Sequence, residues 1–174
     1  TARARRGTDM DTWKSKRVVV TGGAGFLGTH LVGHLRRAGA AVHAPTSREC
    51  DLLRPENALR LLQGNVDAVF HLAARVGGIG ANRTSPATFF RDNLVLGLNL
   101  LEACRVRGVR RLIQVGTVCS YPRVTPVPFR EENLFDGYPE ETNAPYGIAK
   151  RARLVGARAY EQEFGLESVN LLLL

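Results

Sequence analysis

The sequence predicts an α/β fold with a doubly wound parallel sheet, and three observations carry this prediction. Residues 17–20 bring three consecutive valines, which is typical of a buried parallel strand. Glycines at 22, 25 and 28 follow at once and lead into an apolar helical pattern. Short apolar runs then alternate with helical stretches along the rest of the chain, which favours right-handed crossovers covering both faces of the sheet.

Each expected element has its own boundary signals. Proline stands where two helices would start, and glycine stands where helices would stop. The stretch 117–143 holds four prolines and no periodicity, so we expect a long functional loop there. The expected strands are Arg17–Thr21, Ala41–Ala44, Asp67–Ala73, Arg111–Gly116 and a last one from Glu167; the expected helices run from Phe26 to about Ala38, from Pro55 to Leu62, from Pro86 to about Arg107 and from Tyr146 to Phe164.

The glycine turn predicts a dinucleotide site of the Rossmann type. Gly22 permits a tight turn, Gly25 lets the backbone approach a pyrophosphate, and Gly28 lets the helix pack closely on the strand. The free N–H groups at Phe26 and Leu27 then face the phosphates. The alternative is an ordinary glycine-rich turn, but the strand before and the helix after it favour the dinucleotide interpretation.

The length and the charge of the chain limit the classes of protein to which it can belong. The 174 residues suffice for one domain, which we expect over 17–174, after a basic, disordered lead-in over 1–16. Residues 1–17 carry six cations and two acids, so 6 − 2 = +4 of the net charge of +8 lies there. The rest is scattered without aromatic interleaving, which argues against a nucleic-acid partner. No apolar run is long enough for a membrane span and no secretory signal opens the chain.

Cysteine usage and the chain's end give two further expectations. Cys50, Cys104 and Cys119 have no metal-ligand spacing, so we expect no metal site and reduced thiols in the cytoplasm. The chain stops inside an apolar strand, at Leu174, without a turn or a polar tail. We therefore expect the N-terminal part of a longer protein, with a C-terminal substrate domain missing.

The loop after the second strand bears on the choice of dinucleotide. Ser47 and Arg48 suit a ribose 2′-phosphate, which favours NADP, although NAD stays possible because Glu49 could accept from a free hydroxyl. An ordinary solvated loop is the alternative. Asp51 could accept from the adenine amino group beside Leu52, or simply cap a helix. The end of the third strand, Leu72, Ala73 and Ala74, is expected to complete the cofactor site.

A tyrosine and a lysine four residues apart indicate proton transfer. Tyr146 and Lys150 fall on one face of the last expected helix, where a cation beside the phenol favours the phenolate. Such a pair could move a proton at a carbinol oxygen while hydride moves at carbon. An exposed helical pair is the common alternative. Thr117, at the end of the fourth strand, reaches the same edge of the sheet and could hydrogen-bond the same oxygen.

Four segments together carry a family resemblance: residues 21–28, 71–82, 116–122 and 143–150. From about Arg17 to its last residue the chain resembles the extended short-chain dehydrogenase/reductases, the NAD-dependent epimerase/dehydratase family, that act on nucleotide sugars. It is most similar to the epimerase/reductases of GDP-4-keto-6-deoxyhexoses. The resemblance implies that Thr117, Tyr146 and Lys150 assist hydride transfer, and that Cys119 is an acid–base residue of epimerisation. A small buried core residue is the alternative for Cys119.

The resemblance also implies a substrate, a loop that contacts it and an assembly. The substrate would be a GDP-linked sugar, with Val76, Asn82 and Arg83 as loop contacts, or Asn82 as a turn stabiliser. The second epimerisation residue, a His, would lie beyond Leu174. A homodimer would form through helices 86–107 and 145–164.

Several positions depart from the family's pattern, and other functions stay open. Thr117 replaces a Ser, Arg75 replaces a Lys, and Ala24 stands where some relatives carry an Arg for the 2′-phosphate. The other possible functions are another nucleotide-sugar epimerase or ketoreductase, and a non-catalytic NADP(H)-binding module. A dehydratase is disfavoured because Val118 and Cys119 stand where it needs an Asp–Glu pair.

Overall fold

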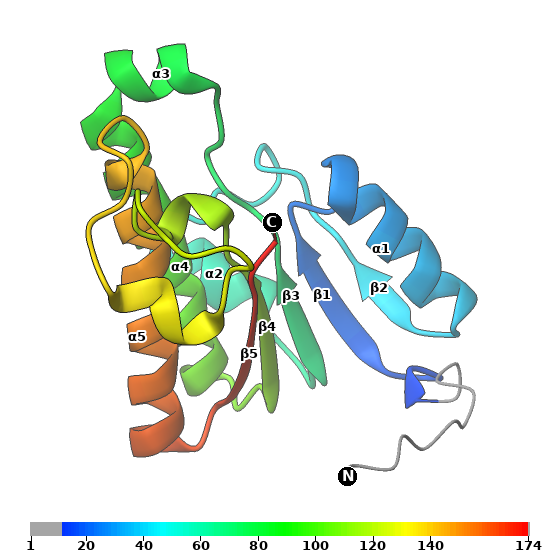
Figure 1. The fold of residues 1–174 in the computed structure, drawn as a ribbon. Coiled ribbons are helices and arrows are strands. Elements are labelled where there is room, and N and C mark those ends of the chain that lie inside the picture. Colours follow the sequence, from blue (N-terminus) through cyan, green and yellow to red (C-terminus); the bar gives the residue numbers. More distant parts are fainter. Residues whose placement is uncertain (1–11, 174) are drawn as a thin grey trace, which may run out of the picture.

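Five parallel strands form one twisted sheet in the computed structural model, which describes residues 12–173 (Figure 1). Their order is β2-β1-β3-β4-β5, so the chain reverses direction across the sheet after β2. The crevice between β1 and β3, where the order reverses, is where open α/β sheets bind ligands. The strands are β1 (Arg17–Thr21), β2 (Ala41–His43), β3 (Ala68–His71), β4 (Arg111–Val115) and β5 (Glu167–Leu171).

Helices cover both faces of the sheet, as the sequence predicts. In Figure 1, α1 lies on one side of the sheet, and α2, α4 and α5 lie on the other. This division follows from right-handed crossovers, because only the β1–α1–β2 unit runs in the opposite direction across the sheet. The helices are α1 (Phe26–Arg37), α2 (Pro55–Leu61), α3 (Ile79–Thr84), α4 (Pro86–Val106) and α5 (Ala144–Phe164).

Two apolar cores fix the helices to the two faces. Alternation along β1 sends Val19 into the core under α2, α4 and α5, while Val18 and Val20 face α1. All three valines are fully buried. The larger core includes Leu100 on α4. Burying this apolar surface holds the carboxyl ends of the strands, and whatever they carry, in one rigid frame.

The helix boundaries agree with the prolines and glycines that predict them. Pro55 and Pro86 occupy the first turns of α2 and α4. Gly39, Gly108 and Gly165 take positive φ angles of 81°, 65° and 70° just after helices α1, α4 and α5. Glycine adopts this left-handed conformation without the steric cost that other residues meet.

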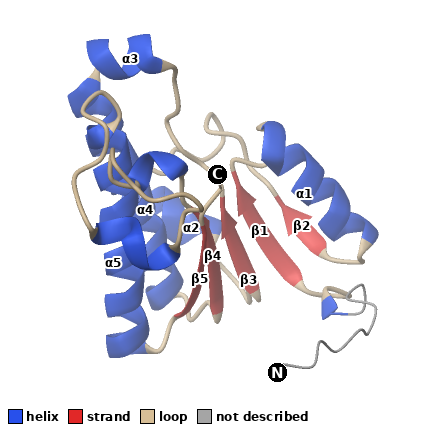
Figure 2. Cartoon of the chain, in the orientation of Figure 1, coloured by secondary structure: helices blue, strands red, loops and turns tan. Residues whose placement is uncertain are grey.

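Two segments differ from the sequence prediction. Helix α3 was not expected, because its six residues are too few to show a helical period. The expected long loop contains two 3₁₀ helices, η2 (Val118–Ser120) and η3 (Glu131–Phe135), which Figure 2 shows as short helical turns between loops. Around them Tyr121 stacks on Phe129 with ring centroids 4.9 Å apart, so the loop has a small core of its own.

The start of the described chain corrects part of one expectation. Residues 12–16 were expected to belong to a disordered lead-in, yet the Trp13 ring packs 5.6 Å from that of Phe70 on the α1 side of the sheet. Lys16 pairs with Asp67 at 3.0 Å. The apolar area of Trp13 is what the charge-based prediction overlooked. The rest of the lead-in, residues 1–11, lies outside the described residues.

Across residues 12–173, no helix combines the length and the apolar character that a bilayer span requires.

Candidate functional site

The glycine turn has the geometry that a phosphate cradle needs. Gly22 has a φ of 73°, and a Cβ at Gly28 would lie 2.2 Å from the Gly22 carbonyl oxygen. At Gly25 a Cβ would meet only that same oxygen, at 3.3 Å. The first hydrogen bond of α1 runs from the Thr29 N–H to the Gly25 carbonyl, so the N–H groups before Thr29 precede the helical ladder. The positive end of α1 therefore meets the crevice with donors free for an anion.

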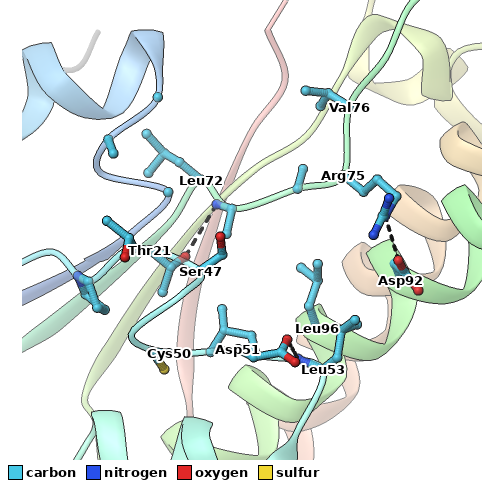
Figure 3. A pocket seen from close by; sticks show the side chains of 18 of the residues that line it. Thr21, Ser47, Cys50, Asp51, Leu53, Leu72, Arg75, Val76, Asp92 and Leu96 are labelled. Atoms are coloured by element: carbon cyan, nitrogen blue, oxygen red, sulfur yellow. Dashed lines mark hydrogen bonds and ion pairs between the residues drawn. The ribbon is translucent and has the colours of Figure 1, made fainter. Parts of the chain in front are cut away.

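A pocket of about 590 Å³ opens beside this turn (Figure 3). Its volume lies in the range of small-molecule and cofactor sites. The walls come from the turn after β1, the loop after β2, the segment after β3, and one face of α4. Of the expected cofactor residues, the lining includes Gly22, Gly25, Phe26, Leu27, Ser47, Asp51, Leu52, Leu72, Ala73 and Ala74, together with Val76 from the expected substrate loop.

Four expected cofactor residues, Gly28, Arg48, Tyr146 and Lys150, do not line this pocket. Gly28 is buried under the turn, where it serves packing. Arg48 is exposed on the loop after β2. Tyr146 and Lys150, expected to hold the cofactor as well as to assist catalysis, lie on α5 and outside the pocket lining, with Lys150 bonded to the end of β4.

The loop after β2 is shaped by one carboxylate that turns back on it. The Glu49 carboxylate accepts from the N–H and the hydroxyl of Thr46, both at 2.8 Å. The Thr46 backbone N–H is the main cause of the lowered pKa of Glu49. The Glu49 carboxylate therefore already makes its hydrogen bonds within its own turn.

Asp51 lines the pocket, and its carboxylate accepts from the Leu53 N–H at 3.0 Å in a local turn before α2 begins at Pro55. The helix-cap alternative is therefore wrong, because the N-cap residue of α2 is Arg54, with no side-chain cap hydrogen bond.

An ion-pair cluster stands at the opposite wall. The Arg75 guanidinium lies 2.6 Å from the carboxylate of Asp92, and Arg91 lies 2.6 Å from the other oxygen of that carboxylate. Figure 3 shows the pair between Arg75 and Asp92. Asp92 is buried on α4, whereas both arginines reach solvent. Sequence reasoning noted Arg75 but missed its partner. The available signal was a carboxylate in the apolar stripe of a helix, next to Phe89 and Leu96 in the helical period.

The tyrosine and the lysine lie together at the end of β4. The Lys150 ammonium is 5.6 Å from the centroid of the Tyr146 ring and donates to the Val115 carbonyl at 3.1 Å. Lys150 is 4% exposed. The Thr117 hydroxyl accepts from the Cys119 N–H at 3.2 Å, which leaves its own proton free for another acceptor. The structure therefore brings the four expected catalytic residues to one edge of the sheet.

Burial dominates the ionisation of this group. It lowers the pKa of Lys150 to about 7, with a smaller contribution from the charge of Arg153. Burial also raises the pKa of Tyr146, and the negative charge of a Cys119 thiolate would raise it further. The charge of Arg153 and a hydrogen bond with the Thr117 hydroxyl lower the pKa of Tyr146 by a smaller amount. The sequence argument predicted a lowered pKa for this phenol. Desolvation outweighs the nearby cations in the protein alone.

The close packing of η2 on α5 fixes these side chains relative to one another. A Cβ at Gly147 would lie 2.2 Å from the Cys119 carbonyl oxygen, so the glycine allows direct backbone contact. The Ser120 hydroxyl donates to the Gly147 carbonyl at 3.2 Å. The Arg151 guanidinium donates to the carbonyls of Ser120 and, at 2.7 Å, Gly137. These bonds tie the strand-end loop to the helix that carries Tyr146.

The three residues expected to contact the substrate follow β3 and differ in their exposure to solvent. Val76 and Arg83 are exposed. Asn82 is buried and donates its amide to the carbonyls of Gly77 and Gly78, at 3.1 and 3.2 Å. Asn82 therefore has the contacts of the turn stabiliser that the sequence left as an alternative.

With this geometry established, comparison with known proteins identifies the family. Residues 18–174 match the model of the NAD dependent epimerase/dehydratase family. The chain belongs to the NAD-dependent epimerase/dehydratase family. This agrees with the resemblance that the sequence motifs carry.

A GDP-L-fucose synthase of Sinorhizobium fredii is 36% identical to this chain over 156 residues. The alignment covers 89% of this chain and 50% of that protein. Among solved structures, it resembles GDP-mannoheptose C4 reductase from Campylobacter jejuni with NADP bound, with a TM-score of 0.86 at 26% identity, covering 91% of this chain and 51% of that one. A GDP-L-fucose synthetase from Naegleria fowleri bound to NADP superposes with a TM-score of 0.78 at 26% identity, covering 91% of this chain and 53% of that one. The chain spans about half the length of the relatives it matches.

The residues of this family member fit a dinucleotide. The open face of Gly25 and the donors at the start of α1 suit a pyrophosphate, and the pocket continues from them to the loop after β2. Within residues 12–173, no group of three or more His, Cys, Asp or Glu side chains is placed to hold a metal ion.

Proposed function

We propose that this protein is a nucleotide-sugar epimerase/reductase that acts on a GDP-4-keto-6-deoxyhexose with NADPH. One observation carries the proposal: Thr117, Cys119, Tyr146 and Lys150 meet at the carboxyl edge of the sheet, the same edge at which the pocket by the glycine turn opens. The names of the relatives, which include GDP-L-fucose synthases, support the GDP-sugar class of substrate. Residues 17–174 would form the dinucleotide-binding domain of the protein, with substrate groups supplied from outside this chain.

The cofactor choice rests on the loop after β2. Glu49, a carboxylate that could have accepted from a ribose hydroxyl, is turned onto Thr46. Thr46 and Ser47 present hydroxyl groups at the pocket wall, with Arg48 beside them. A 2′-phosphate fits such a surface better than a free hydroxyl does. Two of the similar structures, which have NADP bound, support the same choice.

Reduction would use Thr117, Tyr146 and Lys150 at one carbonyl oxygen. When bound, NADPH supplies the hydride that adds to carbon 4 of the sugar. The Thr117 hydroxyl donates a hydrogen bond to the ketone oxygen, and the Tyr146 phenol gives that oxygen its proton as the carbonyl becomes an alcohol. Lys150, held on the Val115 carbonyl, then stabilises the phenolate that Tyr146 leaves behind.

Epimerisation would use Cys119. A ketone at carbon 4 acidifies the C–H bonds on either side of it, so a base can remove a proton and leave an enolate. The half-buried Cys119 thiolate would exchange a proton with one face of that carbon, and a second group outside this chain would serve the other face.

A second candidate function is a non-catalytic NADP(H)-binding module. The observation in its favour is that the pocket is built within a chain that spans about half of its relatives' length. The presence of both Tyr146 and Lys150, each buried or half-buried at the strand ends, favours catalysis.

We also propose a cytoplasmic location, since Cys50, Cys104 and Cys119 are free thiols.

The test incubates the protein with GDP-4-keto-6-deoxymannose and NADPH in deuterated water, and reads the product by NMR and mass spectrometry. We expect oxidation of NADPH with deuterium at carbons 3 and 5. Tyr146→Phe should slow NADPH oxidation by roughly 10²- to 10⁴-fold and leave exchange in place. Cys119→Ser should suppress exchange, whereas Cys104→Ala, at a buried cysteine remote from the site, should not.

Each other result would remove one part of the proposal. Oxidation of NADPH without deuterium uptake would reduce the function to a ketoreductase and return Cys119 to a structural role. Saturable NADPH binding with neither reaction would favour the binding module.

A further inference from the structure

Arg153 is a buried cation without an acidic partner. Its side chain is 3% exposed on α5, and it makes no ion pair with any of residues 12–173. Nε and Nη2 donate to the Gln114 Oε1 atom at 3.3 and 3.0 Å, while Nη1 has no hydrogen-bond partner. Burying an unpaired charge is costly, so its place in the fold calls for a specific reason.

The surroundings of Arg153 connect it to Tyr146 and Lys150. Positions 146, 150 and 153 follow an i, i+4, i+7 pattern and so share one face of α5. Gln114, which anchors the guanidinium, directly precedes Val115, whose carbonyl holds Lys150.

The opposing helix leaves room for this side chain. A Cβ at Gly97 on α4 would lie 2.4 Å from the Arg153 side chain, so this glycine makes space for the cation.

Gln114, which accepts the hydrogen bonds of Arg153, belongs to a row of polar side chains across the sheet. Thr21, His71, Gln114 and Asn170 are register partners on four neighbouring strands. Thr21 and His71 share a hydrogen bond of 2.7 Å, and Gln114 donates to Asn170 at 3.1 Å. The row lies near the carboxyl edge, where the strands meet the site. Arg153 therefore contacts a framework that sets the end of β4.

We propose that Arg153 is a positioning residue for the Tyr146–Lys150 pair: a fixed cation, anchored on Gln114, that favours the phenolate of Tyr146 and the neutral amine of Lys150. The inference rests on the proposed catalytic roles of those two residues. Their ionisation can nevertheless be measured without turnover, so the two proposals can fail separately.

Among the residues that the structure describes, the titratable groups that face Arg153 do not include a carboxylate that would neutralise its charge. Tyr146 and Lys150 face it from α5 itself, and His71 from β3. Cys119 on η2 is the further titratable neighbour of Tyr146. The charged side chains of α4 have partners elsewhere: Asp92 with Arg75 and Arg91, and Glu102 with Arg105.

The pKa directions agree with this geometry. The charge of Arg153 lowers the pKa of both Lys150 and Tyr146. Burial lowers the pKa of Arg153 itself to about 10, so the guanidinium stays protonated at neutral pH. A permanent cation thus acts on both partners in the same direction.

The test titrates both groups in this chain. The sequence has three lysines, Lys14, Lys16 and Lys150, so ¹³C-lysine labelling gives three Cε signals, and Lys150→Arg assigns one of them. Tyrosinate absorbance, taken as the difference from Tyr146→Phe, reports the phenol. In Arg153→Gln we expect the pKa of Lys150 to rise from about 7 towards its usual value. We expect the pKa of Tyr146 to rise further as well.

A merely structural role predicts a different pair of shifts. If Arg153→Gln only loosened the packing, water would enter and both groups would move towards their usual values. The pKa of Lys150 would then rise while that of Tyr146 fell. A falling or unchanged pKa of Tyr146 therefore overturns the proposal, even if Lys150 shifts as expected.

Two matched variants complete the design. Arg158→Gln removes the same charge from an exposed position of the same helix and should shift neither group. Arg153→Lys keeps a cation and should retain most of the depression at Lys150. Circular dichroism at each pH confirms that a variant is folded. Equal shifts in Arg153→Gln and Arg158→Gln would contradict a specific role for the buried cation.

Discussion

At the scale of single residues, burial has opposite consequences for the two proposed proton-transfer groups. It favours the neutral amine of Lys150 and the neutral phenol of Tyr146, because both charged forms lose hydration in the site. Tyr146 is thus held as the proton donor that reduction of a ketone needs. Lys150 titrates near neutral pH and so can change charge when an anionic ligand or a phenolate forms nearby.

The depressed pKa of Lys150 predicts a pH dependence of stability. Between pH 7 and 8.5 the unfolded chain binds a proton at this lysine, and the folded chain loses it as pH rises above about 7. The free energy of unfolding should therefore rise with pH in this window, by roughly 1–2 kcal/mol. Urea unfolding at each pH measures it.

Two lysine variants check the source of that rise. Lys150→Met should abolish it, because the titrating group is gone. Lys14→Met, which removes an exposed lysine, should keep it. A rise that persists in Lys150→Met would assign the pH dependence to another group.

At the scale of elements, the contact between α1 and the turn after β1 is the tightest packing in the cofactor site. The Cβ position of Gly28 lies 2.2 Å from the Gly22 carbonyl oxygen, a backbone atom that cannot rotate away. Any side chain at Gly28 must push α1 off the sheet and move the donors at its first turn.

Gly28→Ala should therefore destabilise the fold by about 1–3 kcal/mol and weaken NADPH binding. Gly33→Ala is the matched control in the same helix, because its Cβ would meet only the Arg37 side chain, at 3.4 Å. Removing that glycine should be neutral or stabilise the helix by up to about 1 kcal/mol. Thermal unfolding and cofactor titration of both variants decide the matter, and equal behaviour of the two would contradict the packing argument.

How far the sequence predicts each element depends on whether its signal is local. The strands and long helices could be predicted because Pro86, Gly108 and the valines of β1 act within a few residues. The two 3₁₀ helices could not, because packing such as the Tyr121–Phe129 stack stabilises that part of the chain. Helix α3 could not, because its six residues are too few to show a helical period. Buried polar contacts were also missed. The partners of Arg153, on β4 and α4, lie 39 and 56 positions earlier in the chain, which no local pattern reveals.

At the scale of the whole molecule, α4 and α5 pack side by side on one face of the sheet (Figure 1). Apolar side chains remain exposed on both: Leu98 at 40% on α4, and Val155 at 54% on α5. Such residues are what the expected helix-bundle dimer would bury, so a homodimer through these two helices stays our prediction.

Analytical ultracentrifugation tests the dimer. Leu98→Glu and Val155→Glu should shift the protein towards monomer, because each places a charge in the proposed interface. Val124→Glu, on the loop before η3 with its side chain 89% exposed, should leave the assembly unchanged. A monomer at all concentrations, or a dimer insensitive to both helix variants, would contradict this interface.

The central claim is that the pocket beside the glycine turn binds NADP(H), and a fluorescence titration of this chain with NADPH and with NADH tests it most directly. We predict saturable binding that is at least about tenfold tighter for NADPH, since a phosphate contact of this kind contributes roughly 1.5–3 kcal/mol. Gly25→Val should abolish binding without unfolding the chain, because its side chain would enter the space open to a pyrophosphate. No saturable signal from either cofactor, or binding unaffected by Gly25→Val, would contradict the claim.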